Sequence, residues 1–256
     1  MARDLQKYLR VSSTLFCPGC GLRVLSNLVL RAIDELELNI DDMLFVSGIG
    51  CAAWIPSPHF NADTLHTLHG RAVAFATGAK MVNPKLKVLV ISGDGDLGDI
   101  GGNHLIHAAR RNIDLTVICA NNQNYGMTGG QVACTTPIGA LTATTTEGNV
   151  YRPMDLVRLV QAAGATYAAK YSVTQPLLLT ESIKKSLGIQ GFSFIEVWAP
   201  CHTQFGRRNQ FANPAEMFKD LKDSCITREE AEGLSPEELE GRIITGEFCD
   251  VSNYTD

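Results

Sequence analysis

Two short polar motifs, each at the end of an apolar run, carry the clearest chemistry in this sequence. Gly93-Asp94-Gly95-Asp96 follows the β-branched run Val88–Ser92, and Asn121-Asn122 follows the apolar run Leu115–Ala120. Glycines let a backbone approach a phosphate closely, whereas a bare carboxylate repels one. A carboxylate and an amide oxygen together suit Mg²⁺, which lets a carboxylate and a diphosphate share one site. We therefore predict a magnesium–diphosphate site that includes Asp94 and Asn122.

Three other interpretations fit the same glycine turn. Gly93, Gly95 and Gly98 satisfy G-x-G-x-x-G, the fingerprint of NAD-dependent dehydrogenases. That fingerprint also includes an acidic residue after the next strand, where this chain has asparagines. A calcium loop lacks its third oxygen ligand, because Gly98 stands at that position. A turn without any ligand would leave two aspartates beside a buried strand, which is costly. The nicotinamide-dependent dehydrogenase remains the competing enzyme class.

Four cysteines form a second candidate site. Cys17 and Cys20 make a C-x-x-C pair, while Cys51 and Cys201 each follow a predicted strand. If these segments converge, the four thiolates could share one metal centre. A C-x-x-C pair alone equally suits a redox pair or two free thiols. Tetrahedral zinc on four cysteines is the strongest alternative, and it would make the chain a zinc-stabilised binding module. Cys119, inside a predicted strand, is expected to be a small core residue.

The elements that must position these motifs alternate between strand and helix. Apolar and β-branched runs predict strands at 43–47, 88–92, 115–120, 166–171 and 192–198. Helical spacing and composition predict helices at about 21–36, 72–79, 102–111, 153–163, 175–187 and 214–222. This alternation predicts an α/β fold with a doubly wound, mostly parallel sheet, which binds ligands at the carboxyl ends of its strands. The Thr- and Gly-rich segment 132–150 predicts a long loop that covers the cofactor.

Length and charge narrow the class of protein. The 256 residues carry a formal charge of −5 and a pI near 5.7. We expect one α/β domain over residues 1–209, while residues 210–256 form a helical appendage whose acidic stretch is solvated. The acidic balance argues against nucleic-acid binding. The sequence shows neither a membrane-spanning apolar run nor a signal-peptide core, so we expect a cytoplasmic protein, in which eight cysteines favour metal or redox chemistry over disulfides.

These motifs together resemble a known family. Gly-Asp-Gly followed after 25 residues by Asn-Asn resembles the thiamine diphosphate motif, and the run Asn124–Gln131 resembles the β subunits of 2-oxoacid:ferredoxin oxidoreductases. The resemblance extends over roughly residues 15–209 and implies the thiamine diphosphate-binding fold. It implies a [4Fe–4S] cluster on Cys17, Cys20, Cys51 and Cys201, and Mg²⁺ on Asp94, Asn122 and Asn124. It places Asn122 and Met127 at the catalytic centre. The implied cofactor contacts are Gly50, His69, Gly93, Asp94, Gly95, Asp96, Asn122, Asn124, Met127 and Thr128.

The resemblance also implies a reaction and partners. The family oxidatively decarboxylates a 2-oxoacid with coenzyme A (CoA), giving acyl-CoA and CO₂, while electrons pass through the cluster to ferredoxin. In similar thiamine enzymes an activating glutamate lies on a separate pyrimidine-binding domain, and this chain has room for one α/β domain. We therefore predict an α subunit that carries the missing domain, with γ and ferredoxin-like δ subunits as further candidates. No nucleic-acid or membrane partner is expected.

The segment Thr203–Asn209 bears on the substrate, since it resembles the subgroup that acts on 2-oxoglutarate. Arg207 and Arg208 could bind a second substrate carboxylate or the phosphates of CoA, and a subunit interface is an equal alternative. The residues after Cys51, Ala52-Ala53-Trp54, stand where some relatives carry a lysine, so no role is carried over there. We predict 2-oxoglutarate as the substrate, with pyruvate or a branched-chain 2-oxoacid as the alternative.

Overall fold

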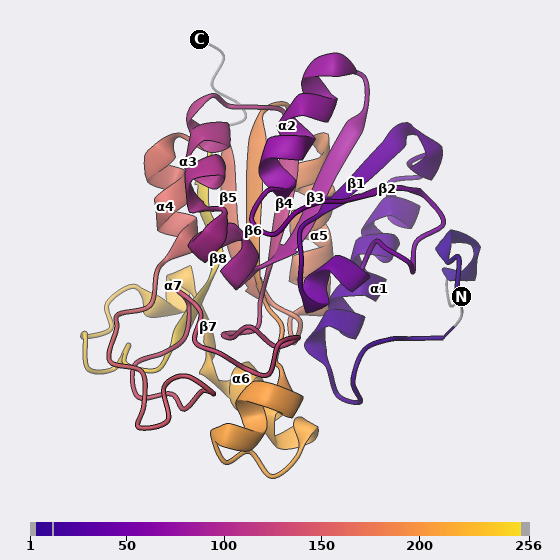
Figure 1. Ribbon diagram of the computed structural model, residues 1–256. Helices are drawn as coiled ribbons and strands as arrows, with labels where there is room; N and C mark the ends of the chain where they lie inside the picture. The colour runs from indigo at the N-terminus through magenta and orange to yellow at the C-terminus, as the bar shows by residue number, and fades with distance from the viewer. Residues whose placement is uncertain (1–3, 12, 252–256) are drawn as a thin grey trace.

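The centre of the molecule is one eight-stranded sheet (Figure 1). The computed structural model describes residues 4–11 and 13–251. The strands lie side by side in the order β2 (Asp63–His66), β1 (Met43–Ser47), β3 (Lys87–Gly93), β4 (Leu115–Asn121), β6 (Phe192–Trp198), β5 (Tyr167–Ser172), β8 (Ile243–Asp250) and β7 (Cys225–Thr227). All neighbours pair in parallel except β5 and β8, which are antiparallel. The predicted doubly wound, mostly parallel α/β fold is confirmed.

Helices cover both faces of this sheet, as a parallel sheet requires. α1 (Gly21–Glu35) and α5 (Pro176–Gly188) pack on one face with strand residues such as Leu89 and Ile91. The other face, which includes Val88 and Val90, is covered by three helices: α2 (Ala72–Val82), α3 (Gly102–Arg110) and α4 (Leu156–Ala163). Alternate residues of a strand point to opposite faces, so each central strand contributes to both hydrophobic cores.

The C-terminal segment differs from the expected helical appendage. It contains α6 (Pro214–Ser224) and the short α7 (Arg228–Ala231), but it also adds β7 and β8 to the sheet. The acidic stretch is therefore mostly turn rather than a helical face. β8 was not predicted as a strand because Gly246 interrupts its apolar residues, and a glycine inside a strand weakens the sequence pattern. The predicted domain (residues 1–209) and appendage (residues 210–256) include residues 1–3, 12 and 252–256, which lie outside the described residues.

The edge strand β2 and the segment 132–150 differ in how well the sequence predicts them. The edge strand β2 was not predicted, because its sequence Asp-Thr-Leu-His is short and polar, with no apolar alternation. Residues 132–150 contain neither helix nor strand, so the predicted long loop is confirmed. Across the described parts of the chain, 4–11 and 13–251, no helix combines the length and apolarity needed to cross a bilayer.

Candidate functional site

A small cavity lies where the carboxyl ends of β1, β3 and β4 meet, and its volume is about 70 Å³. Its wall includes all ten positions at which cofactor contacts were predicted, among them Gly50, Asp94 and Met127. Parallel strands bring their carboxyl ends to one edge, so residues far apart in the chain meet there. The structure therefore gathers the predicted residues into one place at the expected edge of the sheet.

Asp94 is the buried carboxylate of this cavity. It follows β3, its side chain is 1% exposed, and one of its oxygens accepts a hydrogen bond from the Thr135 hydroxyl. Burial raises the pKa of Asp94 to about 7, although the Thr135 hydrogen bond acts in the opposite direction. A dication beside Asp94 would stabilise its charged form. The environment of this carboxylate thus suits a metal ligand.

The amide of Asn122 adds further oxygens beside Asp94. Its side-chain oxygen lies at 3.2 Å from Oδ1 of Asp94 and at 2.6 Å from the main-chain oxygen of Asn124. Turning the amide over would convert both contacts into hydrogen bonds, whereas a cation among the oxygens satisfies them as they stand. Within the described residues, Oδ1 of Asn124 is also buried without a hydrogen-bond partner. An all-oxygen set with an unpaired buried oxygen fits Mg²⁺.

Asp96 has a different environment from Asp94, although it also lies on the cavity wall. Its Oδ1 accepts hydrogen bonds from the backbone N–H groups of Ile49 (3.1 Å) and Gly70 (2.7 Å), and its Oδ2 accepts one from Ser92 Oγ (2.6 Å). His69 Nδ1 lies 2.6 Å from the same Oδ1, so the His69 ring is held at the cavity. Asp96 therefore ties the loop after β1 and the segment before α2 to β3.

The glycines of the turn differ in the space around their Cα atoms. A Cβ at Gly93 would meet nothing within 4 Å, so the backbone there is open toward the cavity. A Cβ at Gly95 would lie 2.6 Å from the Tyr125 ring, and one at Gly98 would lie 2.5 Å from Cys134 Sγ. Gly95 and Gly98 are thus required by close protein packing. This explains the G-x-G-x-x-G match without a dinucleotide.

The four predicted cluster cysteines lie near enough to one another to interact electrostatically. The main-chain N–H of Gly21 donates to the Pro200 oxygen at 3.0 Å, which joins the C-x-x-C segment to the segment of Cys201. Cys51 lies on the cavity wall. Burial, with a smaller contribution from the other thiols of the set, raises the pKa of Cys20 to about 11 and that of Cys51 to about 12. Metal binding would deprotonate such thiols.

The described residues bear on the alternative of a zinc site. Within residues 4–11 and 13–251, no three His, Cys, Asp or Glu side chains are arranged to hold one metal ion. A tetrahedral zinc site needs its four sulfurs around a single atom. A four-iron cube is larger than one ion, so its ligands stand further apart. The arrangement therefore gives the zinc interpretation no geometric support. Cys119 is fully buried in β4, so the prediction that it is a core residue is confirmed.

Arg207 and Arg208 occupy different environments. Arg208 Nη1 donates to the main-chain oxygen and to Oε1 of Gln204, both at 2.9 Å. A Cβ at Gly130 would lie 2.7 Å from the same Nη1, so Arg208 packs against the loop that carries Met127. Arg207 is exposed. Of the two guanidinium groups, the one on Arg208 is adjacent to the predicted cofactor loop.

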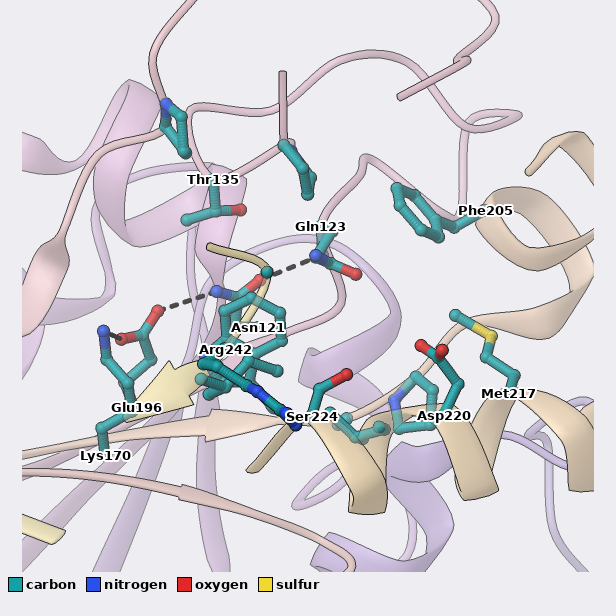
Figure 2. Close-up of a pocket in the computed structure, with 18 of the residues that line it drawn as sticks. Asn121, Gln123, Thr135, Lys170, Glu196, Phe205, Met217, Asp220, Ser224 and Arg242 are labelled. Atoms are coloured by element: carbon teal, nitrogen blue, oxygen red, sulfur yellow. Dashed lines mark hydrogen bonds and ion pairs between the residues drawn. The ribbon is translucent and has the colours of Figure 1, made fainter. Parts of the chain in front are cut away.

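A larger cavity of about 550 Å³ is lined by Asn121 and Gln123, the two residues that flank Asn122 in the chain (Figure 2). Asn121, Gln123, Lys170 and Glu196 line it together with apolar side chains from α6 and the loops around it. None of the ten predicted cofactor positions lies on its wall. We place the chemistry in the smaller cavity, because the converging oxygens and Cys51 are there.

Three further residues contribute to the site, although no sequence pattern singled them out. Thr135 lies in the predicted cofactor-covering loop and reaches Asp94. Tyr125 donates from its hydroxyl to Asp99 Oδ2 at 2.9 Å and fills the space beside Gly95. Ser92 binds Asp96. The composition of the 132–150 segment was a signal for a functional loop, but no pattern within it distinguished Thr135 from its neighbouring threonines.

Comparison with known proteins assigns the class of protein first. The family model "Thiamine pyrophosphate enzyme, C-terminal TPP binding domain" matches residues 48–197; pyrophosphate is another name for diphosphate. The 2-oxoglutarate synthase subunits KorB of Methanothermobacter marburgensis and Methanocaldococcus jannaschii are 50% and 49% identical over 96% of this chain, covering 86% and 91% of their own lengths. This chain belongs to the KorB family of thiamine pyrophosphate-dependent 2-oxoacid:ferredoxin oxidoreductase subunits.

A solved structure agrees with this assignment. The 2-oxoglutarate:ferredoxin oxidoreductase from Magnetococcus marinus, solved with 2-oxoglutarate, coenzyme A and succinyl-CoA bound, superposes with a TM-score of 0.85 at 31% identity. The match covers 97% of this chain and 85% of that one. The predicted family and fold are confirmed. The alternatives of a nicotinamide-dependent dehydrogenase and a non-catalytic zinc module are excluded by the family.

Proposed function

We propose that this chain is the thiamine diphosphate-binding β subunit of a cytoplasmic 2-oxoglutarate:ferredoxin oxidoreductase. The complete enzyme converts 2-oxoglutarate and CoA into succinyl-CoA, CO₂ and a proton, and passes two electrons to ferredoxin. One observation carries the proposal: the oxygens of Asp94, Asn122 and Asn124 and the thiol of Cys51 share the wall of one cavity. Membership of the KorB family supports the reaction class.

The residues at the strand ends account for the diphosphate end of the cofactor. Asp94, Asn122 and Asn124 would hold Mg²⁺, and Gly93 leaves room for the diphosphate beside it. His69, held by Asp96, and the segment Gly50, Met127 and Thr128 line the rest of the cavity. When bound, thiamine diphosphate supplies the carbanion stabilisation that decarboxylation of a 2-oxoacid requires.

The cysteine set accounts for the redox half of the reaction. Cys17, Cys20, Cys51 and Cys201 would hold a [4Fe–4S] cluster, which accepts electrons one at a time. Cys51 and the metal-binding turn both approach Gly126: a Cβ there would lie 3.5 Å from Cys51 Sγ and 3.6 Å from Asn124 Oδ1. Two electrons leaving the substrate would therefore have a short path to the cluster.

The size of the small cavity supports an obligate partner subunit. Ligand pockets ordinarily measure about 300–1,000 Å³, and this cavity measures about 70 Å³. The chain therefore holds one end of the cofactor, and another surface must enclose the remainder. We assign that surface to an α subunit with the pyrimidine-binding domain and its activating glutamate. Further γ and ferredoxin-like δ subunits, with ferredoxin as acceptor, complete the proposed assembly.

The proposed substrate is 2-oxoglutarate, because the compared KorB proteins carry the name 2-oxoglutarate synthase subunit. The second carboxylate of this substrate needs a cationic partner, and the bidentate guanidinium of Arg208 beside the cofactor loop is the candidate on this chain. Its alternative role is binding a phosphate of CoA. Arg207, which is exposed, is assigned to the subunit interface.

The test uses the complex purified without oxygen, with the chain alone as control. We expect bound thiamine diphosphate, magnesium and about four irons per chain, with CoA-dependent dye reduction that is faster on 2-oxoglutarate than on pyruvate. The chain alone should be inactive. Absence of thiamine diphosphate and iron from an assembled complex would refute the reaction class, whereas preference for pyruvate would refute the substrate alone.

A further inference from the structure

We propose that Glu196 and Lys170 are positioning residues for the Mg²⁺-binding turn at the end of β4, and that they act through Asn121. The inference rests on the proposed function, since it concerns how the turn presents Asn122 and Asn124. None of the three proposed positioning residues lies on the wall of the small cavity. They act from behind the turn, on the side of the larger cavity (Figure 2).

The hydrogen bonds run in one direction, with each donor in the turn pointing toward the sheet. Asn121 Nδ2 donates to Glu196 Oε1 at 2.7 Å, and Asn121 Oδ1 accepts from the main-chain N–H of Gln123 at 3.0 Å (Figure 2). Residue 123 lies between the two asparagines that supply metal-ligand oxygens, and it has a left-handed backbone with φ of 63°. The Asn121 side chain therefore fixes a strained backbone position inside the metal-binding turn.

Glu196, which accepts the hydrogen bond from Asn121, is itself held by a buried ion pair with Lys170. Glu196 and Asn121 are each 2% exposed, and Lys170 Nζ lies 3.2 Å from Glu196 Oε2 and 3.4 Å from Asp155 Oδ1. Burial lowers the pKa of Lys170, but the two carboxylates outweigh this effect and the pKa is raised overall. Lys170 and Glu196 are register partners on β5 and β6, so the pair is mounted on the rigid sheet.

The larger cavity explains why these polar contacts matter for the turn. Asn121, Gln123, Glu196 and Lys170 all line its 550 Å³, so the back of the turn faces space rather than close-packed apolar side chains. Packing against neighbours normally holds a buried turn in place. Here the Asn121–Glu196 bond shares that role with the Thr136 hydroxyl, which donates to the main-chain oxygen of Gln123 at 2.7 Å. Loss of the Asn121–Glu196 bond would let the turn and its ligand oxygens shift.

A purely structural role predicts a different result from a positioning role. Replacing a buried ion pair by apolar residues of similar size is often neutral for stability. Removing a partner that orients a metal ligand typically lowers metal affinity 10- to 100-fold. A variant that exchanges the ion pair for apolar side chains leaves the buried Asn121 Nδ2 without its acceptor and should melt somewhat lower. If Glu196 positions the turn, this variant should also lose Mg²⁺ affinity, which a purely structural role does not predict.

The experiment measures thiamine diphosphate bound by the αβ complex at equilibrium while Mg²⁺ is varied, with the melting temperature recorded for each variant. In the double variant Glu196→Leu/Lys170→Met we expect the Mg²⁺ concentration for half-saturation to rise at least tenfold. In Glu196→Gln/Lys170→Met the Gln oxygen still accepts from Asn121, so half-saturation should stay within about threefold of wild type. Glu181→Gln, which removes the exposed Lys184 pair far from the site, is the matched control.

The outcomes separate the two levels of the proposal. Unchanged Mg²⁺ half-saturation in the Leu/Met variant, or equal loss in the Leu/Met and Gln/Met variants, overturns the positioning role. If the Leu/Met variant does not assemble, Asn121→Ala leaves the ion pair in place, and its expected tenfold rise or its absence decides the question. Failure of the wild-type complex to bind thiamine diphosphate at any Mg²⁺ concentration would instead refute the proposed function.

Discussion

The Asp96 carboxylate offers the sharpest test of how the site is held together, because it joins three segments of the chain. Asp96→Ala would leave the buried Gly70 N–H and the part-buried Ile49 N–H without their acceptor. An unsatisfied buried donor costs about 1–3 kcal/mol. We assign about 2 kcal/mol to Gly70 and about 1 kcal/mol to Ile49. The free energy of unfolding should therefore fall by about 3 kcal/mol.

Asp96→Asn is expected to be much milder. Its Oδ1 would still accept from both backbone N–H groups, and the Ser92 hydroxyl can rotate to accept from the new amide nitrogen. We expect a loss of about 1 kcal/mol, from the missing charge and the weaker contact with His69. Because about 1 kcal/mol moves the melting temperature of a chain of this size by about 2–4 °C, the Ala variant should melt about 6–12 °C lower and the Asn variant about 2–4 °C lower.

The assay is the melting temperature of the anaerobic complex, recorded at one protein concentration without added cofactor, because ligand binding would raise it. The exposed Asp63 on β2 provides a matched Asp→Ala control, which should change the melting temperature little. An Ala variant within 3 °C of wild type, or an Asn variant as unstable as the Ala variant, would refute this account of the carboxylate. The Ala variant should also bind less thiamine diphosphate at limiting Mg²⁺.

Three further predictions concern the cofactors and the substrate. Thr135→Val removes the hydroxyl that binds the buried Asp94 carboxylate, the proposed Mg²⁺ ligand, so the affinity for Mg²⁺ with thiamine diphosphate should fall roughly tenfold in equilibrium dialysis. An unchanged affinity would contradict the proposed role of the loop. Cys51→Ser should deplete iron and the visible absorption of the complex, whereas Cys249→Ser, on the distant strand β8, should retain both. Arg208→Ala should raise the KM for 2-oxoglutarate or CoA about tenfold or more, while Arg207→Ala should leave both KM values within about twofold. Equal effects of the two substitutions would refute the assignment of Arg208, rather than Arg207, to ligand binding.

Much of the fold was determined locally and could therefore be predicted from the sequence. The central strands β3 and β4 are largely apolar runs, and β6 is apolar apart from Ser193 and Glu196, because both faces of each strand are buried; this pattern is visible without any tertiary information. The positions of Asp94, Asn122 and Cys51 were also accessible, since each follows a strand and parallel strands end at a common edge. β2 and β8 were missed because pairing with a neighbouring strand, rather than their own composition, makes them strands.

The tertiary structure alone decided which side chains support those residues. Asp94 and Asp96 have the same residue type and spacing to a glycine, yet Asp94 faces converging oxygens, whereas Asp96 binds two loops and strand β3. Arg207 and Arg208 are adjacent in sequence and differ in environment. The Glu196–Lys170 pair joins strands far from Asn121 in the chain. The reason is physical: a local pattern encodes burial and direction along the chain, whereas hydrogen bonds between distant segments depend on atomic positions that only packing fixes.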